Sequence, residues 1–224
     1  MAVLIIVALI WLLLHLGVAG TFVRQAIIAR IGANPFRALF SGAALVVLAA
    51  LVRAYAYADT VVLWSAPGWL RWLLAGVMLP AFVLLVAAFR ANPTAAGGEQ
   101  FLRQDVRGIQ RVTRHPMMVA VATWAAVHMI GAGDAASLVF FGTFLVTAAA
   151  GMPSIDRKVA GRNPGGWVRL NERTSILPFV AILAGRNHFS PGEIGWLVPA
   201  IGVVLWLVVL LVHGSLFGVS VLPA

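Results

Sequence analysis

The stretch "RHPMMVAVATWAAVHMIGAGD", which runs from Arg114 to Asp134, decides the fold class. Pro116 stands where an apolar run begins, and proline suits the first turn of a helix because its missing N–H would have no partner there. The letters "GAGD" then supply a tight turn before a second apolar run. The stretch therefore predicts a helical hairpin of Pro116–Gly131 and Ala136–Met152.

The composition predicts that lipid, rather than water, surrounds most of the chain. Of 224 residues, 62% are hydrophobic and 10% are charged, whereas soluble domains carry about 25% charged residues. The chain has no cysteine, which excludes disulfides, thiolate catalysis and cysteine-ligated metals. Basic and aromatic residues do not interleave, so we expect no nucleic-acid partner. The predicted partner is the lipid bilayer.

The apolar runs predict an all-α, polytopic membrane helix bundle that forms a single domain over residues 1–224. A bilayer core of about 30 Å needs roughly 20 apolar residues in a helix. About six runs qualify or nearly qualify. The predicted spans are Val3–Val23, Leu39–Tyr57, Trp69–Phe89, Pro116–Gly131, Ala136–Met152 and Ile194–Phe217. The first run has no charged n-region and is too long for a cleaved signal, so we expect it to be a span.

The positive charges predict the orientation of these spans. Of the sixteen lysines and arginines, all but Arg53 and Arg71 lie in the first, third and fifth loops. Basic loops face the cytoplasm. We therefore expect a multi-pass protein of the bacterial inner membrane with both termini in the periplasm.

Two segments outside the spans are also apolar in part. Over Glu99–Arg114, apolar residues recur at helical spacing and arginines fall on the opposite face, which predicts an amphipathic helix on the inner membrane surface. Its apolar residues are Leu102, Val106, Ile109 and Val112. The segment Ser175–Leu183 is too short to span, so we expect an interfacial or re-entrant piece.

Histidines inside spans are candidates for function, because ionisable groups are costly in lipid. His15 in the first span and His128 in the fourth each lie about 18 Å from opposite membrane surfaces, so their depths differ by only roughly 6 Å. Two imidazoles near the midplane of a helix bundle suit the axial positions of a haem iron. Alternatively, each histidine bonds to a neighbouring helix and carries no chemistry. No acidic residue is predicted within a span, which argues against a carboxylate proton relay.

Several stretches resemble the NnrU family of membrane proteins in order along the chain. They are "LIIVALIWLLLHLGVAG" (4–20), "RIGANPFRALFS" (30–41), "IQRVTRHPMMVAVATWAAVHMIGAGD" (109–134) and "FFGTFLVTAAAGMPSIDRK" (140–158). The resemblance implies a role in bacterial denitrification and nitric oxide metabolism. It also implies a relation to the 15-cis-zeta-carotene isomerases, membrane haem b proteins that isomerise a polyene double bond. Their haem-ligand positions match His15 and His128, whereas their cysteine corresponds to Ala125, so a thiolate cannot exchange with a ligand here.

A second, more distant resemblance concerns Arg114-His115-Pro116 and "WVRLNERTSILPF" (167–179). These stretches resemble the isoprenylcysteine and phospholipid methyltransferases, which implies S-adenosylmethionine binding at the cytoplasmic face with Glu172 and Arg173 as the polar pair. The tyrosine of those enzymes is replaced by Met117–Met118. We therefore interpret the likeness as a shared fold rather than a shared reaction.

These observations together predict an integral membrane haem b protein of the NnrU type. His15 and His128 are the expected iron ligands, and Arg24, Arg114 and His115 are candidates for contact with the haem propionates or the substrate. The expected chemistry is polyene isomerisation on a hydrophobic small molecule, or a redox role in nitric oxide metabolism. One alternative is a methyltransferase. The other is a non-catalytic assembly factor whose membrane protein partner is a nitrogen-oxide reductase. His188 and His213 receive no role.

Overall fold

The computed structural model describes residues 1–90 and 102–221, and these residues confirm the all-α fold class. A bridge between Val62 and Asp134 is the single strand-type pairing within these two ranges. The helices are α1 (Ala2–Leu12), η1 (Leu13–Val18), α2 (Phe22–Ile31), α3 (Ala33–Ala56), α4 (Gly68–Arg90), α5 (Ile109–Val112), α6 (Pro116–Ala132), α7 (Ala135–Arg162), α8 (Pro164–Arg173), α9 (Val180–Leu183), α10 (Pro191–Ile194) and α11 (Leu197–Phe217).

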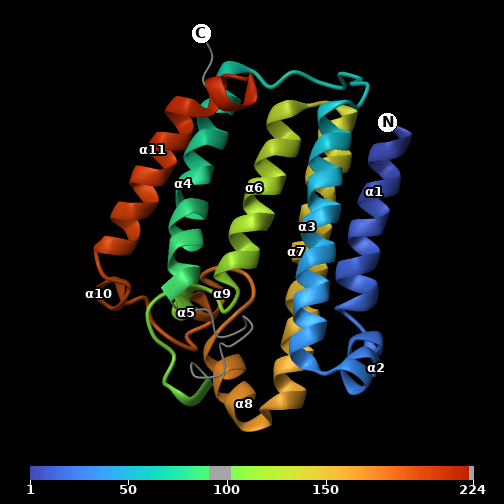
Figure 1. The fold of residues 1–224 in the computed structure, drawn as a ribbon. Helices are drawn as coiled ribbons and strands as arrows, with labels where there is room; N and C mark the ends of the chain where they lie inside the picture. Colours follow the sequence, from blue (N-terminus) through green and yellow to red (C-terminus); the bar gives the residue numbers. More distant parts are fainter. Residues whose placement is uncertain (91–101, 222–224) are drawn as a thin grey trace.

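The long helices α1, α3, α4, α6, α7 and α11 run side by side and form the body of the bundle (Figure 1). Within the described residues, α3, α4, α7 and α11 are each long and apolar enough to cross a membrane, and α1 with its continuation makes a fifth candidate. Helix α6 is apolar but only 17 residues long. The chain is therefore a multi-pass membrane protein with four or five full-length candidate spans, where the sequence predicted about six.

The predicted hairpin is present as α6 and α7. Gly133 closes α6 with a φ of +69°, and a Cβ there would come within 2.2 Å of the Trp64 carbonyl oxygen, so only glycine fits this turn. The Asp134 side chain then accepts a hydrogen bond from the Ser137 N–H at the start of α7. The predicted end at Met152 is wrong, because α7 continues through Pro153 to Arg162. Membrane helices tolerate an internal proline where neighbouring groups satisfy the freed backbone.

The first predicted span is not one straight helix to Val23. Helix α1 passes into the π-helical turn η1, which contains His15, and α2 then turns away at 75°. The bend follows Gly20, and the Thr21 side chain caps α2 by accepting a hydrogen bond from the Val23 N–H. Helix α2 therefore lies across the end of the bundle instead of continuing the span (Figure 1).

The predicted amphipathic helix over Glu99–Arg114 is not formed in its described part. Residues 99–101 lie outside the described residues, and residues 102–114 contain one α-helical turn, α5. Gly108 precedes α5 with a φ of +58°, a conformation that interrupts a helix and favours glycine. The four apolar residues of the pattern are nevertheless buried, whereas Arg114 is buried as well and does not face solvent. Helices α2 and α8 are the surface helices instead.

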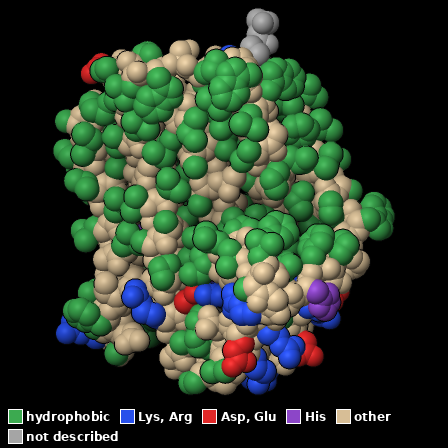
Figure 2. Space-filling view, turned by 180° about the vertical axis from the view of Figure 1, so that it is seen from behind, with side chains coloured by type: hydrophobic (Ala, Val, Ile, Leu, Met, Phe, Trp, Pro, Cys, Tyr) green, Lys and Arg blue, Asp and Glu red, His purple; other side chains and the backbone are tan. Residues whose placement is uncertain are grey.

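The two ends of the bundle differ in charge. The start of α1 and the end of α11 lie at one end, which we call the terminal end (Figure 1). Charged side chains gather at the opposite end, around α5, α8 and α10, and hydrophobic side chains cover most of the rest of the face in Figure 2. We call this second end the basic end. That the basic end faces the cytoplasm stays a prediction from the positive-inside rule.

Helix α11 packs closely against α4. A Cβ on Gly202 would lie 2.9 Å from the Val83 Cα, so the two backbones approach as closely as glycine allows. The Trp206 indole N–H donates a 2.8 Å hydrogen bond to the Ala75 carbonyl. These contacts fix the position of α11, and with it that of His213 near its end.

Candidate functional site

The "RHP" motif holds a buried ion network at the basic end. The Arg114 guanidinium donates hydrogen bonds to the Asp156 carboxylate, at 2.7 Å from Nη2 and 3.0 Å from Nε to Oδ2. The His115 Nε2 lies 2.7 Å from Asp156 Oδ1. His115 is fully buried, and Arg114 and Asp156 are 6% and 7% exposed. One carboxylate on α7 therefore binds the two residues that precede α6.

Extended backbone on either side positions this network. The Arg114 N–H donates to the Ser175 carbonyl, and the Phe179 N–H donates to the Val112 carbonyl. Fully buried Thr113 donates from its hydroxyl to the Ile176 carbonyl at 2.7 Å. The interfacial piece predicted over Ser175–Leu183 is thus a loop that pairs with residues 112–114 and ends in α9.

This network differs from the predicted cofactor contacts of Arg114 and His115. Both side chains are directed at Asp156, and the Arg114 guanidinium also lies 5.2 Å from the Trp167 ring centre. Sequence reasoning missed Asp156 because α7 was expected to end at Met152, which placed the carboxylate in a loop. Removing one partner of a buried ion pair typically costs about 3–5 kcal/mol. The network therefore connects α6, α7 and the loop before α9, and losing one of its partners should destabilise that junction.

A second ion pair lies nearer the surface of the basic end. The Arg111 guanidinium donates two 2.8 Å hydrogen bonds to Glu193, and the Gly108 N–H donates a third at 2.7 Å. The side-chain hydrogen bond from Arg111, followed by that from Gly108, lowers the pKa of Glu193 to about 2. Glu193 precedes α11, so this pair ties the start of α11 to α5.

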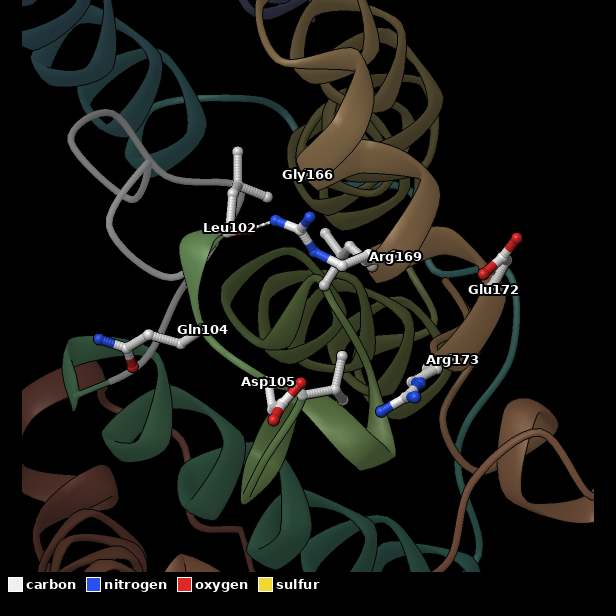
Figure 3. A pocket seen from close by; sticks show the side chains of 9 residues that line it. Leu102, Gln104, Asp105, Gly166, Arg169, Glu172 and Arg173 are labelled. Carbon is white, nitrogen blue, oxygen red and sulfur yellow. Dashed lines mark hydrogen bonds between the residues drawn. The ribbon is translucent and has the colours of Figure 1, made fainter.

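A small cavity of about 90 Å³ lies between α8 and residues 102–106 (Figure 3). Arg169 extends across it and donates a 3.0 Å hydrogen bond to the Leu102 carbonyl. Glu172 and Arg173, the predicted polar pair for S-adenosylmethionine, lie at its edge. Small-molecule sites usually enclose about 300–1,000 Å³, so this cavity is too small for such a ligand.

A larger, apolar pocket of about 310 Å³ lies between α4 and α6. Its lining residues are Met78, Ala81, Phe82, Leu85, Ala120, Val121 and Trp124. No charged side chain lines it, and the Trp124 and Phe82 rings supply flat apolar walls. The volume and lining suit a hydrophobic ligand that enters from the lipid.

His15 lies on the side of the bundle that faces α3. Its ring stacks on Trp11 at 4.0 Å between centres and meets Phe40 at 5.4 Å. Its Nδ1 lies 3.0 Å from the Trp11 carbonyl oxygen, so Nδ1 carries the proton and Nε2 keeps its lone pair. The π-helical turn that contains it is a feature common at functional sites.

His128 lies one turn beyond Trp124 on α6. Its Nδ1 lies 2.8 Å from the Trp124 carbonyl oxygen, which again leaves Nε2 with its lone pair. Its ring stacks on Phe141 at 4.7 Å and faces the His213 ring at 6.2 Å. The sequence-based prediction did not pair His128 with His213, because His213 was expected to lie too close to the outer membrane surface to share a site with it.

Among the described residues, no ring contact joins His15 directly to His128. Trp11 and Trp124 both contact Phe144, so these two rings lie at a similar level. His15 follows Trp11 by one turn toward the basic end, and His128 follows Trp124 by one turn toward the terminal end. The ligation of one haem by this pair stays a prediction.

Arg24 also lies apart from both histidines. It stands on α2 at the basic end, with its guanidinium 5.7 Å from the Phe36 ring centre. Its nearest charged neighbours include Arg162 and Arg37. The predicted set of His15, His128, Arg24, Arg114 and His115 is therefore spread over three places: the α1–α3 side, the terminal half of α6 and the basic end.

Comparison with known proteins relates the whole chain to one family. The sequence profile described as "NnrU protein" matches residues 3–221. The chloroplastic 15-cis-zeta-carotene isomerase of Zea mays is 26% identical over 192 residues, which cover 83% of this chain and 51% of the plant protein. The corresponding protein of Arabidopsis thaliana is 29% identical over 188 residues, which cover 80% and 50%.

The chain thus spans about half the length of the plant proteins that it matches. No solved structure matches it. The profile match covers nearly every residue described above, including the "RHP" network, the apolar pocket and the histidines. The chain belongs to the NnrU family.

Proposed function

We propose that this protein is a membrane-embedded isomerase that acts on a hydrophobic polyene. The observation that supports the proposal best is the apolar pocket between α4 and α6, which is bordered by Trp124 and Phe82 and has no charged lining residue. A conjugated chain has flat faces that stack on aromatic rings, and it partitions into lipid. The names of two relatives, the 15-cis-zeta-carotene isomerases, point to the same substrate class.

Cis–trans isomerisation requires few polar side chains. One π bond weakens, the two carbons rotate and the π bond forms again, so no atom, proton or electron is gained or lost. The protein has to hold the polyene in one orientation and exclude water, which an apolar pocket does. The lack of charged residues in the pocket lining is therefore compatible with this chemistry.

Haem b stays the proposed cofactor, and iron would supply a redox-active centre when bound. His15 and His128 each present an imidazole with Nδ1 fixed by a backbone carbonyl, as metal-bound histidines do. We assign no reaction step to the haem. A link to nitric oxide metabolism, a membrane protein partner and a place in the bacterial inner membrane rest on the family resemblance and on charge. The methyltransferase alternative gains no support from the 90 Å³ cavity beside Glu172.

The proposal is tested by filling the pocket. Purified protein in liposomes is incubated with 15-cis-zeta-carotene, and the isomers are separated by chromatography. Val121→Trp places an indole in the pocket, and we expect at least a roughly tenfold slower conversion. Val46→Trp is the matched control, because Val46 is 70% exposed on α3 and faces away from the core. Wild-type protein that leaves the cis isomer unchanged, or equal rates for wild type and Val121→Trp, would overturn the proposal.

A further inference from the structure

Helix α2 lies at the basic end in a direction that suits the membrane surface (Figure 1). It follows η1 after a bend of 75°, so it runs almost at a right angle to the first span. Phe22 at its start is 78% exposed, and exposed aromatic side chains on a surface helix insert at the boundary of headgroups and acyl chains. Gly32, with a φ of +87°, then turns the chain back into α3. The neighbours of α2 are therefore lipid headgroups.

Cations from α2, α3 and α7 gather around α2. Arg24 is partly buried, and its guanidinium lies 5.7 Å from the ring centre of buried Phe36 on α3. Its charged neighbours include Arg37 of α3 and Arg162 of α7. The charged neighbours of Lys158 on α7 include Arg24 in turn. We call Arg24, Arg37 and Lys158 the α2 cation cluster.

Hydrogen bonds to the end of η1 position Lys158. Its ammonium donates to the Ala19 carbonyl, and the Ser154 hydroxyl donates a 3.3 Å hydrogen bond to the Gly20 carbonyl. These two bonds tie α7 to the chain just before α2. An ammonium has three N–H donors, and among the described residues Lys158 uses one of them in this way. The others are available to a ligand.

No carboxylate of the described residues compensates this cluster. Within residues 1–90 and 102–221, none forms an ion pair with Arg24, Arg37 or Lys158. Asp156 precedes Lys158 by two positions, but such residues do not face each other on a helix, and Asp156 is bound in the buried network. Burial, followed by repulsion from Arg162 and Arg37, lowers the pKa of Arg24. An anion beside these cations would offset that repulsion.

The position of the cluster favours a lipid over a soluble anion. The cations lie at one end of a bundle whose long helices are candidate membrane spans, which is the level of the headgroups. The same helix carries exposed Phe22 beside Arg24. A phospholipid offers a phosphate to the cations and acyl chains to the apolar side chains, whereas a soluble anion offers only the first.

We propose that Arg24, Arg37 and Lys158 bind the phosphate of an anionic phospholipid in the leaflet at the basic end. A guanidinium binds two phosphate oxygens at once, and a lysine adds a point charge. Basic pockets between membrane helices bind headgroups with more than one phosphate. Cardiolipin, with two phosphates, should therefore bind more tightly than phosphatidylglycerol. The site goes beyond the proposed isomerase activity and does not depend on it.

Native mass spectrometry of the full-length protein tests the site. The protein is purified in a neutral detergent and titrated with cardiolipin, and the lipid-bound fraction is measured. Arg24→Gln and Lys158→Gln should each weaken binding about fivefold, whereas Lys158→Arg, which keeps the charge, should retain most of it. Arg90→Gln is the matched control, because it removes an exposed arginine from the end of α4 at the same end of the bundle, and it should bind like wild type.

Two comparison ligands identify the source of the phosphate. Phosphatidylcholine, which has no net charge, and inorganic phosphate should each bind at least roughly tenfold more weakly than cardiolipin. Equal cardiolipin binding by wild type, Arg24→Gln and Lys158→Gln would overturn the proposal. Inorganic phosphate that displaces cardiolipin at equal concentration would also overturn it, because the site would then take a soluble anion.

Thermal unfolding separates lipid binding from a folding defect. Without lipid, Arg24→Gln should melt like wild type, because its side chain is only partly buried and has no ion pair among the described residues. Cardiolipin should raise the melting temperature of wild type and Arg90→Gln more than that of Arg24→Gln, since a ligand stabilises the folded state in proportion to its affinity. The same rise in all three proteins would contradict the site.

Discussion

The basic end and the terminal half of the bundle use polar residues in opposite ways. At the basic end, Arg114 and His115 are bound to Asp156 and are almost completely buried. In the terminal half, His128 and His213 are each fixed by one backbone carbonyl, and their rings lie 6.2 Å apart. The difference teaches that the polar motif most visible in the sequence stabilises the fold, whereas the apolar region holds the features that suit a ligand.

The largest effect is expected from breaking the ion network at the basic end. Asp156→Ala leaves the Arg114 guanidinium buried without its carboxylate, and we expect a loss of about 3–5 kcal/mol in stability. Thermal unfolding of the protein in detergent measures this loss as a lower melting temperature or as absent folded protein. Glu172→Ala, which removes an exposed carboxylate nearby, should melt like wild type. Equal melting of Asp156→Ala and wild type would show that the network does not stabilise the fold.

A medium effect is expected where α11 meets α4. Gly202→Ala introduces a Cβ that lies 2.8 Å from Val83 Cγ2 and 2.9 Å from Val83 Cα, so the helices have to separate. Such overpacking typically costs about 1–3 kcal/mol. Gly76→Ala is the control, because nothing lies within 4 Å of the position that its new methyl group would take. The melting temperature of Gly202→Ala should be lower than that of wild type, and the melting temperature of Gly76→Ala should be equal to that of wild type or higher. The reverse order would mean that α11 is not packed as described.

The smallest effect is expected from the exposed pair of Arg111 and Glu193. Hydrogen bonds lower the pKa of Glu193 to about 2 in the folded protein, below its ordinary value of 4.5. The pair therefore stabilises the fold above pH 4.5, and the contribution is lost as the pH falls toward 2. Because Glu193 is exposed, we expect less than about 1 kcal/mol. The difference between the melting temperatures of Glu193→Gln and wild type should be largest near pH 7 and should shrink as the pH is lowered toward 2. A difference that grows in acid would contradict the assignment.

Much of the fold follows from local patterns in the sequence. Pro116 and "GAGD" predict the α6–α7 hairpin, and helical spacing predicts the burial of Leu102, Val106, Ile109 and Val112, although no continuous helix forms there. The end of α7 was missed because the apolar run stops at Met152, whereas the helix continues through Pro153 into the charged residues up to Arg162. Asp156 was therefore assigned to a loop.

Less of the candidate site than of the fold could be predicted from the sequence. Residue counting gives the depth of His15 and His128 but not the direction in which each ring points around its helix axis. His213 was set aside because of its depth, although the crossing of α11 over α4 brings it to His128. The apolar pocket has no sequence motif, since its residues differ from ordinary core residues only in the space that they leave between α4 and α6.

The central claim is that a hydrophobic substrate binds between α4 and α6 and not at the basic end. Photo-crosslinking tests it most directly: a polyene-like apolar probe with a diazirine is irradiated with the protein in liposomes, and the labelled residues are mapped by mass spectrometry. We predict labels on the pocket residues Phe82, Leu85 and Val121, and their loss when 15-cis-zeta-carotene competes. Labels that concentrate at Arg169–Arg173, or that do not respond to the competitor, would contradict the account.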